Sequence, residues 1–318
     1  MPNIMFNFKA LNHLQINNMR KIIVGIGEIL WDVFPERKIL GGAPANFVYH
    51  ISQLGYNGYL VSAVGNDLSG KEILDSLKDK KLNYLIESID YPTGTVKVTL
   101  NEEGVPQYEI CEQVAWDYIP FRERTAELAK NTAAVCFGSL AQRNKTSRET
   151  IQKFLKIVPS HCIKIFDINL RQHFYTKTII EESMKMSDIL KMNDDEIKVI
   201  ADMYNWKEMD EQQICRNLLK IFSLDLIILT KGTEGSFVFN SESTSYQPTP
   251  KVTVKDTVGA GDSFTAAFIA AYMQGKPISQ THKFAAEVSA YVCEQHGAMP
   301  ELSEVHTRFL ELNIPPLK

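Results

Sequence analysis

The sequence predicts an α/β fold, in which helices cover both faces of a doubly wound and mostly parallel β-sheet. Short apolar runs alternate with amphipathic segments along most of the chain, as expected when strands and helices follow one another. Several runs are continuously apolar, which is typical of parallel strands that are buried on both faces. Polar and glycine-containing stretches follow the ends of several runs, where ligands bind in sheets of this kind.

The first predicted strand is the apolar run 20–27. Elements of alternating type follow it, and we expect them at about 44–54 (helix), 58–64 (strand) and 69–80 (helix). The Val/Thr-rich stretch 95–100 predicts a strand, and 108–111 predicts its partner across the turn 101–104. These two stretches therefore predict a hairpin.

The second half of the chain continues the alternation. Apolar runs predict strands at 133–139, 162–168, 187–192 and 225–230. Amphipathic segments predict helices at about 146–157, 178–186, 194–203, 209–222 and 279–295. Another helix is expected from Phe264 onward, because Phe264, Ala267, Phe268 and Ala271 recur at helical spacing.

Composition, charge and cysteine spacing indicate a globular protein and argue against nucleic-acid-binding and membrane-spanning classes. The 318 residues are 44% apolar and 23% charged, which fits an ordinary soluble globular protein. The net charge of −4 argues against a nucleic-acid-binding surface, which usually needs a basic excess. No apolar run approaches the length of a membrane span. The five cysteines lack CxxC spacing and indicate reduced thiols in a cytoplasmic protein.

Residues 1–18 differ from the rest of the chain. They are rich in asparagine and lack the apolar core of a signal peptide. We expect a single folded domain over 19–318. The first 18 residues would then be a poorly ordered extension, or would precede a natural start at Met19.

The stretch 255–265 is the first candidate for chemistry. Gly259, Ala260, Gly261 and Asp262 form a turn that runs into the predicted helix. The first N–H groups of a helix have no partner within it and attract anions. This turn therefore predicts a site that stabilises a migrating phosphoryl group, with Asp262 as the base that takes a hydroxyl proton. The alternative is that Asp262 is only a helix N-cap.

A second stretch, 41–47, also begins a helix. The double glycine Gly41-Gly42 allows a polar ligand to approach the backbone. Asn46 offers both a donor and acceptors, which suits a polyol. Together, 41–47 and 255–265 resemble the two signature motifs of the PfkB carbohydrate kinase family, also called the ribokinase-like family. The resemblance extends from about Arg20 to Ala298.

This resemblance implies a ribokinase-like, three-layer fold with a sugar site under a small β-sheet lid. The lid would be formed by about 30–40 and 93–115, inserted into the main domain. The residues implied for the sugar are Asp32, Gly41, Gly42, Asn46 and Arg171. Arg171 belongs to the pattern D-x-N-x-R and has an alternative role, a salt bridge to Asp167 or to a lid carboxylate. For Asp67, in a G-x-D-x-x-G loop, a functional role and a turn or cap role are both open.

The resemblance also implies ATP and Mg²⁺. In the family's N-x-x-E pattern, Asn193 would lie near the nucleotide phosphates and Glu196 would orient waters around Mg²⁺. As an alternative, the same residues make a good helix start. The T-x-G-x-x-G turn and the last helix would contact the nucleotide through Thr230, Gly232, Gly235, Ala286 and Ser289. A K⁺ loop is implied around Asp256, Val258 and Gly297.

The function implied by the resemblance is ATP-dependent phosphorylation of a sugar, and the motifs are most similar to those of fructokinases. Ribose, ketodeoxygluconate, another ketose and a nucleoside remain alternative acceptors. A non-catalytic sugar or nucleotide sensor is the alternative from another class. The chain lacks GxxxxGK[ST], and Leu30 stands where GxGxxG needs a third glycine, which disfavours a P-loop kinase and a dehydrogenase. The seven histidines lack metal-ligand spacing. The resemblance also implies a homodimer through the lid.

Overall fold

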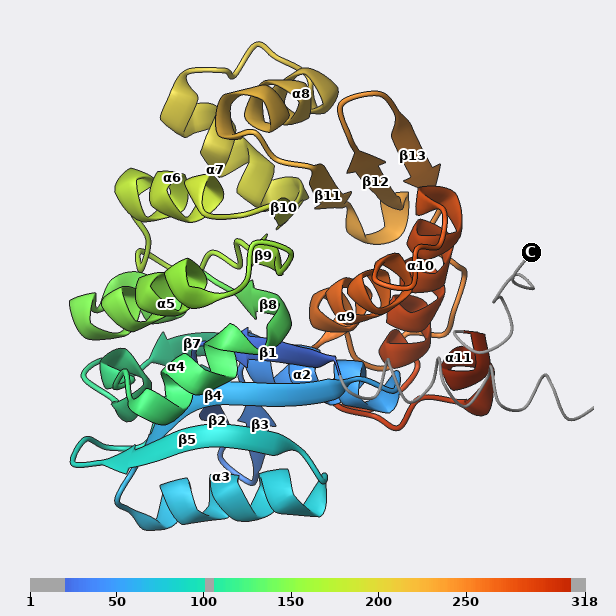
Figure 1. Cartoon of the computed structure of the whole chain (residues 1–318). Coiled ribbons are helices and arrows are strands. Elements are labelled where there is room, and N and C mark those ends of the chain that lie inside the picture. Colours follow the sequence, from blue (N-terminus) through green and yellow to red (C-terminus); the bar gives the residue numbers. More distant parts are fainter. Residues whose placement is uncertain (1–20, 101–105, 310–318) are drawn as a thin grey trace, which may run out of the picture.

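The computed structural model describes residues 21–100 and 106–309 (Figure 1). Within them lies a nine-stranded sheet in the order β13-β12-β11-β10-β9-β8-β1-β4-β5. Neighbouring strands from β11 across to β5 are parallel, whereas β12 and β13 are antiparallel. The strands are β1 (Ile22–Ile26), β4 (Asn57–Gly65), β5 (Asn83–Ile89), β8 (Thr132–Phe137), β9 (Ile163–Asp167), β10 (Ile189–Asn193), β11 (Leu226–Thr230), β12 (Ser236–Phe239) and β13 (Thr244–Gln247).

Helices cover both faces of this sheet, as predicted. On one face, apolar side chains join the strands to α2 (Ala43–Gln53), α3 (Leu68–Asp79), α9 (Ala260–Tyr272) and α10 (Ile278–Cys293). On the other face they join the strands to α4 (Glu123–Lys130), α5 (Lys145–Ile157), α6 (Lys177–Lys185), α7 (Asp194–Tyr204) and α8 (Glu211–Phe222). The remaining helical segments are η1 (Ala115–Tyr118), η2 (Leu140–Arg143), η3 (Gly232–Glu234) and α11 (Glu304–Phe309).

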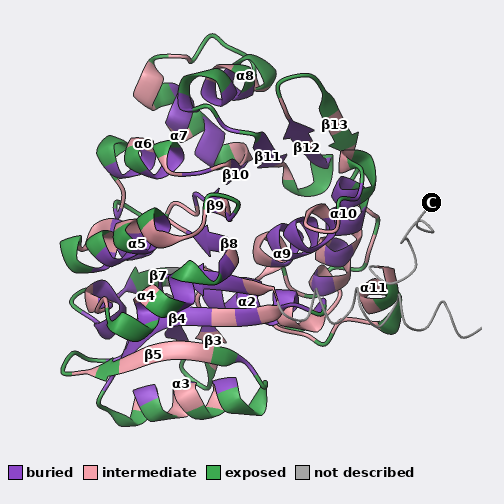
Figure 2. Cartoon of the chain, in the orientation of Figure 1, coloured by how far each residue is buried: buried purple, intermediate pink, exposed green. Residues whose placement is uncertain are grey.

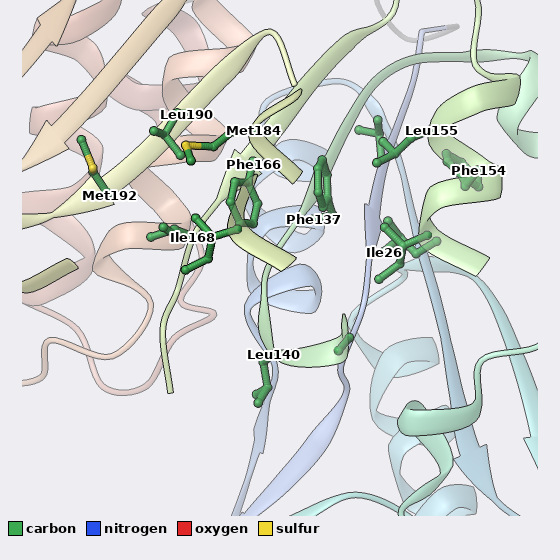
Figure 3. Close-up of a cluster of buried hydrophobic side chains, with 14 of the residues drawn as sticks. Ile26, Phe137, Leu140, Phe154, Leu155, Phe166, Ile168, Met184, Leu190 and Met192 are labelled. Atoms are coloured by element: carbon green, nitrogen blue, oxygen red, sulfur yellow. The ribbon is translucent and has the colours of Figure 1, made fainter. Parts of the chain in front are cut away.

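The buried residues lie along the strands and on the inner sides of the helices (Figure 2). The face that packs on α5 and α6 contains Phe137 and Phe166, whose stacked rings lie 5.3 Å apart between centroids. Ile26, Phe154 and Met184 belong to the same cluster of buried side chains (Figure 3). Burying a side chain of this size contributes roughly 1.5–3 kcal/mol. This packing fixes the strands whose carboxyl ends carry the polar motifs.

A separate four-stranded sheet has the order β3-β2-β6-β7. Its strands are β2 (Leu30–Val33), β3 (Lys38–Gly41), β6 (Thr95–Leu100) and β7 (Pro106–Ile110). Apart from the last residue of β3, these strands lie within the two segments, about 30–40 and 93–115, that the family resemblance implies for the lid. The predicted turn 101–104 lies outside the described residues. Leu30 begins a strand of this sheet rather than a helix, so the dinucleotide-binding alternative lacks the helix it requires.

Asp67 connects the small sheet to the main one. Its carboxylate accepts hydrogen bonds from the N–H of Gly70, at 2.7 Å, and from the N–H and hydroxyl of Thr93. These bonds cap α3 and fix the segment that leads into β6. They also lower the pKa of Asp67, although burial alone would raise it. The structure thus supports the turn and cap role for this residue.

The structure confirms most of the predicted elements to within a few residues. The structure also contains β5, α4 and the hairpin of β12 and β13, in stretches for which no element is predicted above. The five cysteines are free thiols, as expected. Within the described chain, every helix is too short or too polar to span a lipid bilayer. Residues 1–18 lie outside the described residues.

Candidate active site

The turn before α9 is shaped by two glycines for different reasons. Gly259 has φ of +79°, in the left-handed region, and a Cβ on it would lie 2.7 Å from Ala298. Gly261 has no unusual φ, but a Cβ there would lie 2.9 Å from the Lys191 Nζ atom. Gly259 is therefore required by the backbone and its packing, whereas Gly261 leaves room for the ammonium group of Lys191.

Asp262 lies in the first turn of α9, whose N-cap is Gly259 and has no side-chain cap hydrogen bond. The alternative that Asp262 is merely an N-cap is therefore wrong. The N–H of Ala260 donates to the carbonyl of Thr257 at 3.3 Å. For the N–H groups of Gly259 and Gly261, the described residues provide no hydrogen-bond partner. These two groups are the freer donors for an anion.

The carboxylate of Asp262 has the properties of a base. Burial, followed by the charge of Asp167, raises its pKa to about 6, although a hydrogen bond from Asn46 opposes the shift. The Asn46 Nδ2 atom donates to Asp262 Oδ2 at 2.7 Å. At neutral pH this carboxylate is ionised and more basic than an ordinary aspartate. The structure thus brings together one residue from each of the two predicted motifs, which are 216 positions apart.

The predicted sugar residues Asp32, Gly41, Gly42 and Asn46 come together at the start of α2. Gly42 is the N-cap of α2, with φ of +116°, and a Cβ on it would lie 2.5 Å from the carbonyl oxygen of Glu28. A Cβ on Gly41 would lie 2.5 Å from Asp32 Oδ2. Asn46 is only 5% exposed. The double glycine therefore allows Asp32 and the end of β1 to pack closely against this helix.

Arg171 is near enough to Asp32 for its charge to act on that carboxylate, but the two side chains form no salt bridge. Its Nη1 atom donates to the carbonyl of Leu170 at 3.0 Å, and the side chain is exposed. Burial raises the pKa of Asp32, and the charge of Arg171 opposes this rise only in part. The alternative of a salt bridge to Asp167 is wrong, because Lys191 occupies that carboxylate at 3.0 Å.

Two buried charged residues of the site, Lys191 and Glu28, are not among those predicted from the sequence. Lys191 lies in β10, is 7% exposed, and points toward the turn before α9. Glu28 follows β1, is 2% exposed, and burial raises its pKa to about 7. Each is a charged residue in or beside an apolar run, and that signal could have identified both.

Asn193 and Glu196 form the start of α7. The Asn193 Oδ1 atom accepts from the N–H groups of Asp195 and Glu196, both at 2.9 Å. The Glu196 carboxylate accepts from the N–H groups of Leu170 and Asn193. Asn193 and Glu196 therefore do form the helix start that the alternative predicts.

The carboxylate of Glu196 can also accept hydrogen bonds from water. A carboxylate has about four acceptor positions, and the two N–H groups leave some of them free. The described residues hold no group of three or more His, Cys, Asp or Glu that could bind a metal directly. Glu196 thus fits a magnesium ion held through water rather than by a protein cage.

The other residues predicted for the nucleotide occupy two places. Thr230 ends β11, and Gly232 has φ of +51° with open space around it. Gly235 has φ of +104°, but the Gln247 carbonyl would lie 2.4 Å from its Cβ, so packing against β13 also requires glycine there. On α10, Ala286 is buried, and the Ser289 hydroxyl donates to the carbonyl of Ala260 at 2.9 Å. Ser289 therefore supports the turn before α9.

The segment around Asp256 is fixed by its own carboxylate. Asp256 Oδ1 accepts from the N–H of Val258, and Oδ2 accepts from the N–H of Gly297 at 3.1 Å. His50, on α2, is fully buried with Nε2 2.9 Å from the carbonyl oxygen of Ala298. These bonds hold the segment 297–298 in place, and Ala298 of this segment packs against Gly259.

Comparison with known proteins gives a consistent result. The pfkB family of carbohydrate kinases matches residues 27–304. An uncharacterized sugar kinase from Pyrococcus horikoshii, in complex with ATP, is 27% identical with a TM-score of 0.75, covering 87% of this chain and 94% of its own. The ATP-dependent 6-phosphofructokinase of Thermoanaerobacterium thermosaccharolyticum is 27% identical over 321 residues, which cover 95% of this chain and 97% of its own.

Fructokinase from Xylella fastidiosa with bound ATP superposes with a TM-score of 0.78 at 19% identity, covering 92% of this chain and 98% of its own. At that identity the likeness supports the fold alone. The family match, in contrast, spans most of the chain and includes both signature motifs. This chain therefore belongs to the pfkB family of carbohydrate kinases.

Proposed function

We propose that the protein transfers the γ-phosphoryl group of ATP to a primary hydroxyl of a sugar, and that D-fructose is the preferred acceptor. The observation that carries the proposal is the 2.7 Å contact between Asn46 and Asp262. In this contact Asn46, whose amide suits a polyol, touches a basic carboxylate in the first turn of α9, where free N–H groups suit an anion. A sugar held there has its hydroxyl beside the group that can remove its proton.

In the proposed reaction, Asp32, Gly41, Gly42 and Asn46 bind the sugar, and Arg171 donates to it or to the phosphates. Asp262 accepts the hydroxyl proton as the sugar oxygen forms its bond to the γ-phosphorus, while the bond from that phosphorus to the bridging oxygen breaks. Free N–H groups of the turn 259–261 stabilise the charge that develops on the phosphoryl oxygens. Removing one such donor commonly costs about 10²–10³ in rate.

For the nucleotide, we propose Asn193, Thr230, Gly232 and Gly235 near the phosphates and ribose, with Ala286 and Ser289 near the adenine. The ATP complex of the Pyrococcus relative supports ATP as the donor. Mg²⁺, bound through water near Glu196, would neutralise phosphate charge. The carbonyls around Asp256, Val258 and Gly297 offer the oxygen ligands that suit K⁺.

The charges around the sugar residues favour a neutral acceptor over a phosphorylated one. Glu28 and Asp32 are carboxyl groups, and Arg171 is the cation that acts on both. Lys38, in the small sheet, is paired with Glu72. A sugar phosphate carries nearly two negative charges and needs a surplus of cations. This balance supports fructose rather than fructose 6-phosphate, although a relative is named for the latter activity.

The small sheet would act as a lid that excludes water, which otherwise competes with the sugar as acceptor. We also propose a homodimer through this sheet, whose β3 and β7 lie at its two edges. Light scattering tests the dimer, and a monomer mass at working concentration would contradict it.

The proposed acceptor is tested by ADP release with Mg·ATP and a panel of fructose, fructose 6-phosphate, ribose, ketodeoxygluconate, tagatose, glucose and adenosine. Turnover that is fastest on fructose supports the proposal. Turnover on another member keeps the phosphotransfer chemistry and replaces the acceptor. Absence of turnover on every member, with K⁺ present, would favour a sensor, which sugar-induced thermal stabilisation would then reveal.

A further inference from the structure

Lys191 is a buried cation that the reaction described above does not yet use. It lies in β10 and is 7% exposed, and its ammonium group donates to Asp167 Oδ1 at 3.0 Å. Asp167 is the one hydrogen-bond partner of this ammonium group among the described residues. An ammonium group has three donors, so two of them are available to a further acceptor.

The available donors border the anion-binding turn. A Cβ on Gly261 would lie only 2.9 Å from Lys191 Nζ, so the glycine leaves room for the ammonium group. This places a fixed positive charge beside the amino end of α9, which is itself the positive end of the helix. A phosphoryl group that arrives between the ammonium group and the helix end would be stabilised by both.

The acidic neighbours keep this lysine charged and oriented. Burial alone would lower the pKa of Lys191, but the charges of Asp167, Glu196 and Asp262 raise it above its usual value. On its other oxygen, Asp167 lies 3.1 Å from the hydroxyl of Thr265 in α9. The same hydroxyl lies 3.0 Å from the carbonyl of Gly261. Asp167 therefore links Lys191 to the first turn of α9 through the hydroxyl of Thr265.

From this arrangement we propose that Lys191 is a further catalytic residue, which donates hydrogen bonds to the transferred phosphoryl group. It remains protonated throughout. The hydroxyl proton goes to Asp262, the new bond forms between the sugar oxygen and the γ-phosphorus, and the bridging oxygen leaves with ADP. Lys191 stabilises the charge on the phosphoryl oxygens, and Asp167 is its positioning residue. The inference rests on the proposed phosphotransfer but not on the identity of the sugar.

The test uses Lys191→Met, together with the double variant Lys191→Met/Asp167→Asn, in which no carboxylate is left unpaired. Both are compared with wild type on the acceptor that wild type turns over. We expect kcat to fall by about 10²-fold or more in each variant, since this is the usual effect of removing one stabilising donor. The dissociation constant for the sugar should change by less than about threefold, because Lys191 contacts the transferred group.

A second measurement separates a catalytic role from a structural one. Calorimetry compares the binding of Mg·ADP with that of Mg·ADP plus aluminium fluoride, which mimics the phosphoryl group in transfer. Wild type should bind the mimic more tightly than ADP alone, and the double variant should lose most of that preference while retaining ADP binding. Lys164→Met is the matched control, because Lys164 lies in β9 and pairs with Asp188 away from the turn.

A folded double variant whose kcat stays within threefold of wild type would overturn the inference. So would an undiminished preference for the mimic, or an equal loss of sugar affinity and kcat. These results differ from a failure of the proposed function, in which wild type itself would turn over no acceptor. If Lys191→Met alone fails to fold, the double variant still tests whether Lys191 stabilises the transferred phosphoryl group.

Discussion

Replacing Asp262 by Asn should remove activity and, at the same time, make the protein more stable. The pKa of Asp262 is raised from 3.8 to about 6, mainly by burial. A carboxyl group whose pKa is higher in the folded state resists ionisation there, so its charge opposes folding. This cost is absent below pH 3.8, grows between pH 3.8 and about 6, and is complete above that range.

A rise in the pKa from 3.8 to about 6 corresponds to about 3 kcal/mol of free energy, at about 1.4 kcal/mol for each pH unit. At pH 8 the ionised carboxylate therefore reduces the free energy of unfolding by about 3 kcal/mol, and at pH 5 by roughly half of that. Asn has nearly the same shape and carries no charge. Asp262→Asn should therefore stabilise the fold by these amounts, which corresponds to roughly 5 °C in Tm at pH 8.

The assay combines urea unfolding at pH 5 and pH 8 with turnover measured at pH 8. Turnover should fall by about 10²–10⁴-fold, the usual contribution of a general base. Asp75→Asn is the matched control, because Asp75 is an exposed residue of α3 and its substitution should change stability by less than about 0.5 kcal/mol. The reasoning is refuted if Asp262→Asn is less stable than wild type at pH 8, or if it retains near-normal turnover.

Three further predictions follow from the same site. The value of kcat/KM should fall tenfold per pH unit below about pH 6, as Asp262 becomes protonated, and a flat profile down to pH 5 would contradict this. Asn46→Leu removes the hydrogen bond that lowers the pKa of Asp262, so the acid limb of the profile should move to higher pH rather than lower. Gly259→Ala should cost about 1–2 kcal/mol of left-handed strain plus a clash with Ala298, and urea unfolding should show a larger loss than Gly275→Ala, whose φ is also positive but whose surroundings are open.

The sequence was sufficient for the parts of the site that depend on local signals. Continuous apolar runs predicted the parallel strands, and the glycine-rich turn predicted the start of α9 together with Asp262. Those signals work because backbone freedom and apolar periodicity act over a few residues. The motif at 41–47 was likewise visible, and its contact with Asp262 follows from both motifs lying at one edge of the sheet.

The parts that the sequence could not provide depend on distant contacts. Lys191 meets the turn before α9 across 70 positions, so its place in an apolar run marks it as unusual but does not show what it contacts. The alternative role of Arg171, a salt bridge to Asp167, is wrong for the same reason, since Lys191 on the neighbouring strand pairs with that carboxylate. Residues such as Asn193 and Asp67 fit a functional motif and a helix cap equally well, and only their hydrogen bonds identify the cap.

The central claim is that a sugar hydroxyl is phosphorylated at Asp262, and phosphorus NMR tests it most directly. Wild-type protein, Mg·ATP and the best acceptor of the panel are incubated and the products are followed in one spectrum, beside a sample with Asp262→Asn. The account predicts that the γ-phosphate signal of wild type converts into a single phosphomonoester on a primary hydroxyl, with one ADP formed per ester, and that the variant forms almost none while still binding sugar. Inorganic phosphate as the main product, or equal ester formation by the variant, would contradict the account.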